Sequence, residues 1–393
     1  MNHPSRAVAR RLARIRNFSD LEWAGRRSLP RPIHGYVANA AEDGRTHAAN
    51  RAAFDDYGFL PRTLRDVSGI SLETELLGRH YAAPFGIAPM GISALSGYRG
   101  DLALARAASA AKVPMIMSGS SLVPMEEVVE VPGSDWFQAY LPGDREGIEA
   151  LLERVERAGF RHLVITVDYA VPPNPDNNRR SGFSSPIRPS LRLAVDGLLR
   201  PRWLYHTFYK TLRHHGIPHF ENNFAQRGIP VISRHVNRDF SGRMHLDWEY
   251  LALVRERWKG ALIVKGILHP EDASRAKTLG ADALIVSNHG GRQLDGTIAS
   301  LRALPAIVES VGELPVMIDS GFRRGTDVLK ALALGARFVF FGRPFNYALA
   351  YAGQAGVAHA IELMNAEITR DMALLGITHP RQMTSEWLCP SRR

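Results

Sequence analysis

The stretch VMIDSGFRRGTDVLKALALGARFVFFGRP, residues 316–344, decides the fold class. Two short apolar runs, Val316–Ile318 and Phe338–Phe341, flank the helical pattern Thr326–Leu334, and a Leu-Gly-Ala joint leads from the helix into the second run. Apolar runs without alternation are typical of parallel strands buried on both faces, and a helix is the usual connection between such strands. The stretch therefore predicts one strand–helix–strand unit of an α/β protein.

The same unit recurs along the chain. Six more apolar runs precede this stretch, at Phe85–Pro89, Met115–Met117, Trp136–Tyr140, Leu163–Val167, Leu262–Val264 and Leu284–Val286. Helical patterns lie between the runs, at Asp101–Ala111, Arg145–Ala158, Trp248–Trp258, Glu271–Leu279 and Ile298–Val311. Eight strand–helix units in about 260 residues match the size of a (β/α)8, or TIM, barrel. We therefore predict a single α/β barrel domain spanning residues 1–393.

Two segments do not fit the repeating unit. Residues 170–245, between the fourth and fifth predicted strands, form a Pro-rich, basic insertion far longer than an ordinary strand–helix loop. An insertion at the carboxyl end of a strand lies over the mouth of the barrel, where the active sites of this fold lie. The arginine-rich residues 1–27 predict a helical extension with a solvated basic face, and a mitochondrial address is the alternative.

The net charge of +10 belongs mainly to these two segments. Residues 1–27 carry seven arginines against two acidic residues, and residues 184–245 carry ten basic residues against three acidic ones, so the remainder nets −2. An excess of basic residues can mean nucleic acid, an anionic membrane surface or phosphate-bearing ligands. Because the predicted barrel is nearly neutral, a nucleic-acid partner for the whole protein is not expected.

Composition excludes other classes of protein. A hydrophobic fraction of 45% is too high for a disordered chain. No uncharged apolar window of about 18 residues occurs, so a membrane-spanning helix is not expected. The single cysteine, Cys389, excludes an internal disulfide and favours a reducing, cytoplasmic location.

Polar residues follow the predicted strands at the point where each strand ends. They are Ser118, Gln138, Tyr140, Thr166, Asp168, Lys265, Ser287, Asp319 and Arg343, together with the backbone of Ala88, Pro89, Met90 and Gly91. A single polar residue at a strand end is explained by contact with solvent. A polar residue at the end of many strands, in one pattern, is not well explained in that way. The pattern therefore indicates a site at the barrel mouth.

The loops after the last two strands predict a phosphate site. Arg323 and Arg343 can bind phosphate oxygens in a forked geometry, and Gly342 allows a close approach of the backbone. These two loops form the common phosphate site of barrel enzymes. The alternative is turn glycines beside exposed arginines.

The string VSNHGGRQLD, Val286–Asp295, carries the strongest chemical signal. Two glycines after His289 allow a sharp turn, so that His289 and Arg292 both point into the site. Histidine is the natural base near neutral pH, and arginine grips a carboxylate. Asp168, at another strand end, can orient the imidazole and stabilise its protonated form.

Several motifs together resemble one enzyme family. SNHGGRQLD, DSGFRRGTDVLKALALGARFVFFGRP, IVKGILHPEDA, TVD and YVANAAED resemble the FMN-dependent 2-hydroxy acid oxidising family, which includes glycolate oxidase, L-lactate dehydrogenase and mandelate dehydrogenase. The resemblance implies oxidation of an L-2-hydroxy acid to the 2-oxo acid, with electrons passing from FMN to a quinone or another carrier. An oxygen-using oxidase or monooxygenase is the alternative. A homotetramer is also implied.

The resemblance implies a role for each residue. His289 is the base, Asp168 its partner, and Arg292 the grip on the carboxylate. Tyr36 and Tyr140 contact substrate, and Tyr140 and Lys265 join the catalytic set. The proton that His289 removes is either the hydroxyl proton or the α-carbon proton. No metal is implied, and FMN is held by Ala88, Pro89, Met90, Gly91, Ser118, Gln138, Thr166, Lys265, Ser287, Asp319, Arg323, Gly342 and Arg343.

One position departs from the family pattern. Members carry a second active-site arginine seven residues after the aspartate of TVD, where this chain has Pro175. Arg179 or Arg180 could replace it, or the substrate is not a simple 2-hydroxy carboxylate. Losing one charged partner of a buried carboxylate costs about 2–5 kcal/mol.

The basic insertion has two interpretations. Residues 188–215 interleave six basic residues with Trp203, Tyr205, Phe208 and Tyr209. Such a segment predicts peripheral contact with the inner face of the cell membrane, where aromatic rings meet lipid and arginines meet anionic head groups. The alternative is a lid packed on the barrel rim.

Overall fold

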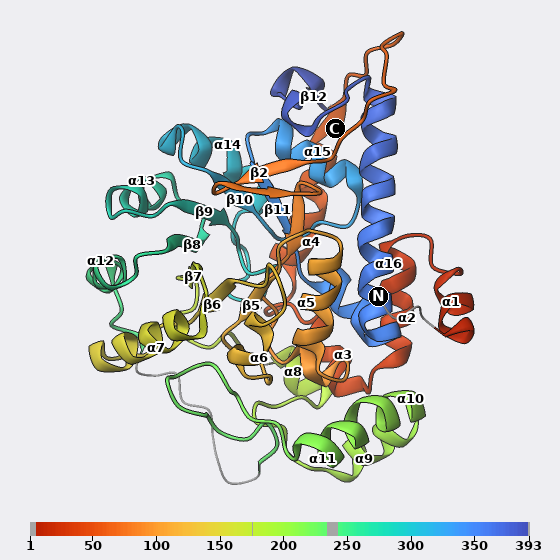
Figure 1. The fold of residues 1–393 in the computed structure, drawn as a ribbon, viewed down its shortest axis with the longest axis vertical. Helices are drawn as coiled ribbons and strands as arrows, with labels where there is room; N and C mark the ends of the chain where they lie inside the picture. Colours follow the sequence, from red (N-terminus) through yellow and green to blue (C-terminus); the bar gives the residue numbers. More distant parts are fainter. Residues whose placement is uncertain (1–4, 175, 234–242, 392–393) are drawn as a thin grey trace.

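Eight parallel strands form the centre of the molecule. The computed structural model describes residues 5–174, 176–233 and 243–391. The sheet order is β4-β11-β10-β9-β8-β7-β6-β5, and the strands are β4 (Phe85–Ile87), β5 (Ile116–Ser118), β6 (Trp136–Ala139), β7 (His162–Thr166), β8 (Ala261–Ile267), β9 (Ala283–Val286), β10 (Val316–Ile318) and β11 (Phe338–Phe341). A parallel bridge between Ile87 and Met115 joins the two edges of the sheet. The predicted barrel is confirmed (Figure 1).

Alternate strand residues fill the barrel interior. Trp136, Phe338 and Phe340 belong to this inner cluster, and each is at most 1% exposed. The antiparallel hairpin of β2 (Thr74–Leu76) and β3 (Arg79–Tyr81) lies at one end of the barrel, where Trp136 Nε1 donates to the Tyr81 hydroxyl at 3.1 Å. Side chains pack this end of the barrel, and the predicted site residues lie at the other end.

The other face of each strand packs against the surrounding helices. These are α5 (Gly100–Ala110), α6 (Met125–Val129), α7 (Arg145–Ala158), α12 (Trp248–Arg257), α13 (Pro270–Thr278), α14 (Ser300–Val311), α15 (Gly325–Ala333) and α16 (Arg343–Leu375). Helix α7 shows how the sequence specifies them. Asp144 caps its first turn through a 2.7 Å bond from Gly147 N, Gly159 ends it at φ 102°, and its buried residues are Ile148, Leu151, Leu152 and Val155.

Helix α16 was not predicted from the sequence. It follows β11 and bends where Ala352 and Gly353 leave the helical conformation, so it consists of two segments. It packs against α5 and against α2 (Phe18–Ser28) of the N-terminal extension. A second unpredicted feature is the antiparallel pair β1 (Tyr57–Phe59) and β12 (Leu388–Pro390).

The N-terminal extension is helical, as expected. It contains α1 (Arg6–Leu12), α2, α3 (Arg31–Ala38) and α4 (Arg45–Ala52). Arg6 and Arg10 are exposed, whereas Arg11 donates to the Tyr351 carbonyl at 2.7 Å and holds α1 against α16. Helix α3 reaches the carboxyl end of the barrel, the lower end in Figure 1.

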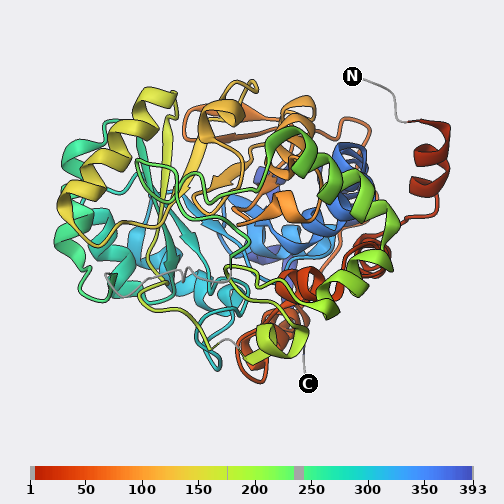
Figure 2. The same ribbon diagram turned by 90° about the horizontal axis from the view of Figure 1, so that it is seen from below.

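The long insertion lies between β7 and α12. It contains α8 (Asp176–Ser181) and a helical arm made of α9 (Leu191–Leu198), α10 (Pro201–Trp203), a π-helical turn (Leu204–Tyr209) and α11 (Lys210–His215). Figure 2 views the lower end of the molecule and shows this arm in green across part of it. The arm therefore lies at the carboxyl end of the barrel, and that the insertion covers the active-site mouth stays a prediction.

Trp203 does not face outward, so its predicted place at a lipid interface is wrong. It is 9% exposed, donates from Nε1 to the Leu95 carbonyl at 2.7 Å, and stacks on the half-buried Phe208 at 5.6 Å. These two aromatic residues anchor the arm to the barrel. Tyr205 and Tyr209 remain exposed.

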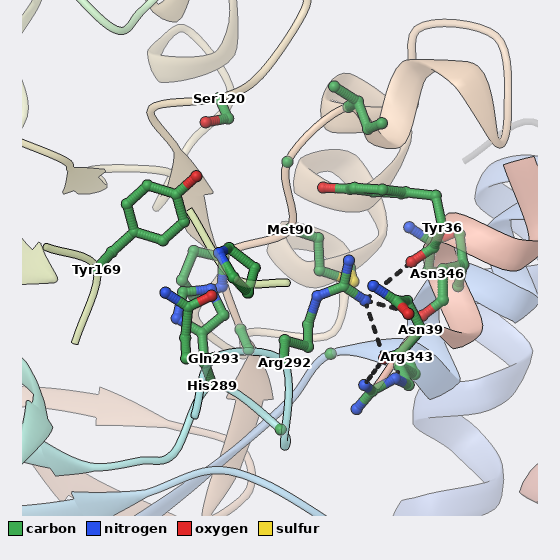
Figure 3. A pocket seen from close by; sticks show the side chains of 18 of the residues that line it. Tyr36, Asn39, Met90, Ser120, Tyr169, His289, Arg292, Gln293, Arg343 and Asn346 are labelled. Carbon is green, nitrogen blue, oxygen red and sulfur yellow. Dashed lines mark hydrogen bonds between the residues drawn. The ribbon is translucent and has the colours of Figure 1, made fainter. Parts of the chain in front are cut away.

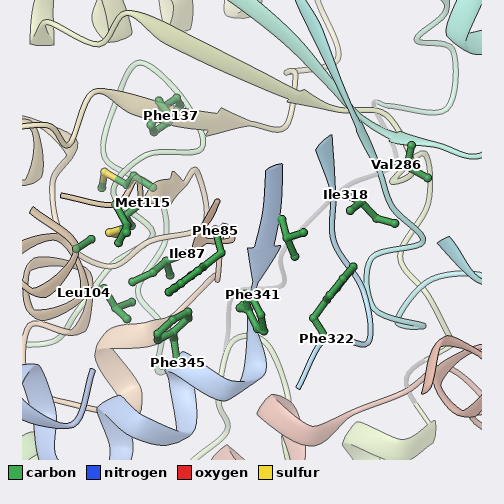
Figure 4. Close-up of a cluster of buried hydrophobic side chains, with 14 of the residues drawn as sticks. Phe85, Ile87, Leu104, Met115, Phe137, Val286, Ile318, Phe322, Phe341 and Phe345 are labelled. Carbon is green, nitrogen blue, oxygen red and sulfur yellow. The ribbon is translucent and has the colours of Figure 1, made fainter. Parts of the chain in front are cut away.

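Phe341 provides a test of the outer core. Its ring packs against Phe85, Phe322 and Phe345 between the strands and helices (Figure 4). Replacing Phe341 with Ala should lower the free energy of unfolding by about 3–5 kcal/mol, because the cavity cannot collapse. Leu374→Ala, at a position 70% exposed, is the control and should cost less than about 0.5 kcal/mol in the same denaturant titration. Equal losses would contradict the packing described.

Candidate active site

A cavity of about 630 Å³ opens at the carboxyl ends of the strands. Figure 3 shows part of its lining. Most of the predicted site residues lie on its wall, namely Tyr36, Ala88, Pro89, Met90, Gly91, Tyr140, Thr166, Lys265, His289, Arg292, Asp319, Arg323, Gly342 and Arg343. The remaining four are not on the wall: Ser118, Gln138 and Ser287 are buried, and Asp168, half-buried, contacts His289. The structure thus brings the whole predicted set together.

His289 occupies a tight turn directly after β9. Its backbone is left-handed, with φ 56°, a conformation that non-glycine residues seldom adopt. Gly291 follows with φ 71°, and a Cβ there would meet the backbone nitrogen of His47 at 2.6 Å. The turn brings His289 Nδ1 to 2.9 Å from Asp168 Oδ1 and Nε2 to 3.3 Å from the Tyr140 hydroxyl. Backbone strain of this kind is typical of functional sites.

Asp168 fixes the protonation pattern of this pair. Burial by itself raises the pKa of Asp168, but the imidazole of His289 and the ammonium of Lys265 outweigh it, so the pKa lies below its ordinary value. The carboxylate therefore accepts a hydrogen bond from Nδ1–H of His289. Nε2 is then the unprotonated, basic nitrogen, and it lies beside Tyr140.

Arg292 is held in place by the N-terminal extension. Its guanidinium donates to the Tyr36 carbonyl at 2.9 Å and to the Val37 carbonyl at 3.3 Å, and its Cζ lies 4.8 Å from the centre of the Tyr36 ring. Figure 3 shows Arg292 between His289 and Tyr36. The last turn of α3 thus positions a cation on the wall of the cavity.

Lys265 lies at the floor of the site and is 3% exposed. Its Nζ donates to Ser287 Oγ at 2.9 Å and lies 3.3 Å from Asp319 Oδ2. Ser287 Oγ also accepts the His289 backbone N–H at 3.0 Å. Because one hydroxyl contacts both residues, the buried ammonium and the histidine turn are held in a fixed relation.

The loops after β10 and β11 concentrate positive charge. Burial, followed by the neighbouring charges of Arg292 and Arg323, lowers the pKa of Arg343 to about 9. Burial also lowers the pKa of Arg323. The pKa of His47 falls to about 4 through burial and then through Arg343, Arg323, Arg292 and Arg51. A cluster that resists one more proton so strongly is suited to a phosphate.

Gln138 tests whether an isoalloxazine-bearing cofactor fits. Ser118 Oγ donates to its Oε1 at 3.1 Å, while the buried Nε2 has no hydrogen-bond partner among the described residues. A buried amide donor without a partner costs about 1–3 kcal/mol. The carbonyl and nitrogen acceptors of a flavin ring would satisfy it, and Arg323 and Arg343 would hold the phosphate. The residues therefore fit FMN.

Some site residues were missed in the sequence. Tyr169 lines the cavity, with its ring 5.0 Å from that of Tyr140 and 6.4 Å from that of His289. It directly follows Asp168, so the strand-end rule that found Asp168 also applied to it. His47 had no local signal, because its environment comes from loops distant in sequence.

Two arginines were expected as replacements for the family's second active-site arginine. Pro175 lies outside the described residues. Arg179 is exposed and lines the cavity, whereas Arg180 is exposed and does not line it. Asp176 is exposed and begins α8.

His47 gives a pH-dependent prediction. In protein freed of bound anions, the pKa of His47 is about 4 in the folded state and 6.5 in the unfolded state. Between these two pH values the unfolded state binds a proton at His47 that the folded state does not bind. Stability is therefore lost as the pH falls from 6.5 towards 4, by at most about 3 kcal/mol. His47→Gln should lose less stability over this window in urea titrations at the two ends. Parallel pH profiles for both proteins would contradict the assignment.

Comparisons with known proteins agree with this geometry. The FMN-dependent dehydrogenase family matches residues 25–390. An L-lactate dehydrogenase of Ectopseudomonas mendocina is 40% identical over 385 residues, covering 95% of this chain and 98% of its own. A second, of Caulobacter sp., is 38% identical over 388 residues, covering 96% and 100%.

Solved structures give the same answer. The monotopic membrane protein (S)-mandelate dehydrogenase has a TM-score of 0.86 at 34% identity, covering 96% of this chain and 99% of that chain. A mandelate oxidase with bound (S)-2-phenylpropionate has a TM-score of 0.78 at 34% identity, covering 95% and 98%. The resemblance seen in the sequence motifs is confirmed, and the chain belongs to the FMN-dependent dehydrogenase family.

Proposed function

We propose that the protein oxidises an L-2-hydroxy acid to the 2-oxo acid and passes the electrons from FMN to a quinone or another carrier. The observation that carries the proposal is the His289–Asp168 pair, because His289 lines one cavity together with Arg292. A base and a carboxylate-binding cation on either side of a substrate are what oxidation of a 2-hydroxy acid needs.

Each residue has a definite part in this reaction. Arg292 and Tyr36 bind the substrate carboxylate, and Tyr140 donates a hydrogen bond from the side of His289. His289 Nε2 removes a proton from the substrate, and Asp168 stabilises the resulting imidazolium. FMN, when bound, supplies the acceptor of the two electrons. Lys265 places a fixed positive charge where a reduced cofactor would carry negative charge.

The relatives support this function. The curated relatives are L-lactate dehydrogenases, and the solved structures are mandelate dehydrogenase and mandelate oxidase. Lactate and mandelate share the 2-hydroxy carboxylate and differ only in the group on the α-carbon. Tyr169 and Phe183 line the cavity and would contact that group.

A panel of 2-hydroxy acids tests the proposal. FMN-loaded protein is mixed without oxygen with the L and D forms of lactate, mandelate and larger homologues, and flavin absorbance is followed. At least one L acid should bleach the flavin rapidly, and its D form should not. An FMN-loaded protein that no 2-hydroxy acid reduces would sink the proposal.

His289→Gln tests the base. The substitution removes the basic nitrogen, so the rate of flavin reduction should fall by about 10²–10⁴-fold while FMN remains bound. The control is His80→Gln, at an exposed position on β3 at the other end of the barrel, which should reduce at the wild-type rate. A rate within threefold of wild type in His289→Gln would rule out this base.

We also propose that the arm at residues 188–215 attaches the protein to the inner face of the cell membrane, where a quinone acceptor is reached. Trp203 holds the arm to the barrel. Three leucines of the arm, Leu191, Leu198 and Leu199, are 84%, 67% and 63% exposed. Exposed basic residues lie among them, at Arg192, Arg202 and Arg213. Apolar side chains interspersed with arginines suit an anionic lipid surface.

Two further findings bear on this attachment. Among residues 5–174, 176–233 and 243–391, no helix is both long and apolar enough to cross a membrane. One structural relative is a monotopic membrane protein, and another is a soluble mutant of the membrane-associated (S)-mandelate dehydrogenase from Pseudomonas putida. The second finding supports surface attachment. A homotetramer remains a prediction.

Substituting the three exposed leucines with Ser tests the attachment. Each buried leucine contributes about 1.5–3 kcal/mol to partitioning, so binding to vesicles containing phosphatidylglycerol should fall by more than about tenfold. Flavin reduction should be unchanged, because the arm's anchor is intact. Leu374→Ser on α16 is the control for one exposed leucine lost elsewhere. Unchanged vesicle binding by the triple variant would contradict attachment through the arm.

A further inference from the structure

A buried arginine lies behind Tyr140. Arg243, at the end of the insertion, is 6% exposed, and its Cζ lies 5.5 Å from the centre of the Tyr140 ring. Leu246 N donates to the Arg243 carbonyl at 3.2 Å, just before α12 begins. Tyr140 lines the cavity, whereas Arg243 is not on its wall. The guanidinium therefore contacts a ring that lines the cavity and does not line the cavity itself.

A second pair at the cavity has the same arrangement. There the guanidinium of Arg292 lies 4.8 Å from the ring centre of Tyr36. Both tyrosines line the one cavity, so two arginine–tyrosine pairs face it from two different parts of the chain. In one pair the N-terminal extension supplies the tyrosine, and in the other the insertion supplies the arginine.

The pairing has an electrostatic consequence. A desolvated cation on the face of an aromatic ring is strongly attracted to it, and in a water-poor site its charge is felt at short range. The Tyr140 hydroxyl, which lies 3.3 Å from His289 Nε2, thereby becomes a better donor to an anion. The described part of the loop after Asp168 contributes Tyr169, Pro172 and Pro173 to the wall. The cation that follows on the wall, Arg179, is exposed, whereas Arg243 is buried and therefore desolvated.

We propose that Arg243 is a positioning residue for the anionic end of the substrate. Acting through Tyr140, it supplies on the His289 side the positive charge that Arg292 supplies on the Tyr36 side. The inference rests on the proposed function, because it takes the substrate to be a carboxylate. The competing explanation is that Arg243 only packs the end of the insertion against the barrel.

Binding of oxalate to the FMN-loaded protein separates these two explanations. Oxalate is an anion with the planar carboxylate of the proposed substrates, and its dissociation constant is measured from its effect on flavin absorbance. Arg243→Met should weaken oxalate roughly tenfold, the size expected for a desolvated cation–π contact. Arg243→Lys, which keeps the charge, should stay within about threefold of wild type. Arg180→Met is the control, since Arg180 is exposed and off the cavity wall.

A double-mutant cycle tests the route through Tyr140. If Arg243 acts through the ring, Arg243→Met should have an effect of less than about threefold in a Tyr140→Phe background. An equal effect in both backgrounds would overturn the proposal, and so would wild-type oxalate binding by Arg243→Met. Should Arg243→Met fail to retain FMN, Arg243→Gln replaces it, and a lysine variant that binds oxalate no better than the glutamine variant overturns the proposal.

The outcome is separable from that of the proposed function. Reduction of wild-type flavin by a 2-hydroxy acid together with Arg243-independent oxalate binding would remove this inference alone. Arg243-dependent oxalate binding in a protein that no 2-hydroxy acid reduces would remove the proposed function and leave an anion site supported.

Discussion

Closure of the parallel sheet is the constraint on which the rest of the molecule depends. Strand β4 pairs with β11 on one side, and the Ile87–Met115 bridge joins it to the chain ahead of β5 on the other. In a closed parallel ring every strand ends at the same mouth. Asp168 and His289, 121 residues apart in sequence, meet there at 2.9 Å. The mouth is thus where distant residue types can act as one site.

The mouth is also where the protein stores unbalanced positive charge. Arg323 and Arg343 are held beside Arg292 in surroundings that lower the pKa of Arg343 to about 9 and that of His47 to about 4. Burying cations this closely is costly unless anions accompany them. A phosphate and a substrate carboxylate are such anions, so binding them also stabilises the fold. For the surplus charge outside the barrel we propose a separate use, in the arm of the insertion.

The sequence predicts well what local pattern controls. The eight strands follow from apolar runs, and α7 follows from its cap, its period and its terminal glycine. Prediction fails where the cause is tertiary. Helix α16 bends at Gly353 without a local stop signal. Trp203 turns inward and donates to the carbonyl of Leu95, which is distant in sequence. Arg243 lies beside the Tyr140 ring, a contact that no local pattern predicts. Strand-end positions led to His289, Asp168 and Tyr140, but not to Tyr169 and Arg243, which lie beside the Tyr140 ring.

The central claim is that His289, Asp168 and Arg292 serve the oxidation of a 2-hydroxy carboxylate. Product analysis under single-turnover conditions without oxygen tests it most directly. FMN-loaded protein is mixed with the L-2-hydroxy acid that bleaches it fastest, and 2-oxo acid is quantified against flavin reduced. The account predicts one 2-oxo acid for each flavin bleached. Bleaching that yields no 2-oxo acid would contradict it.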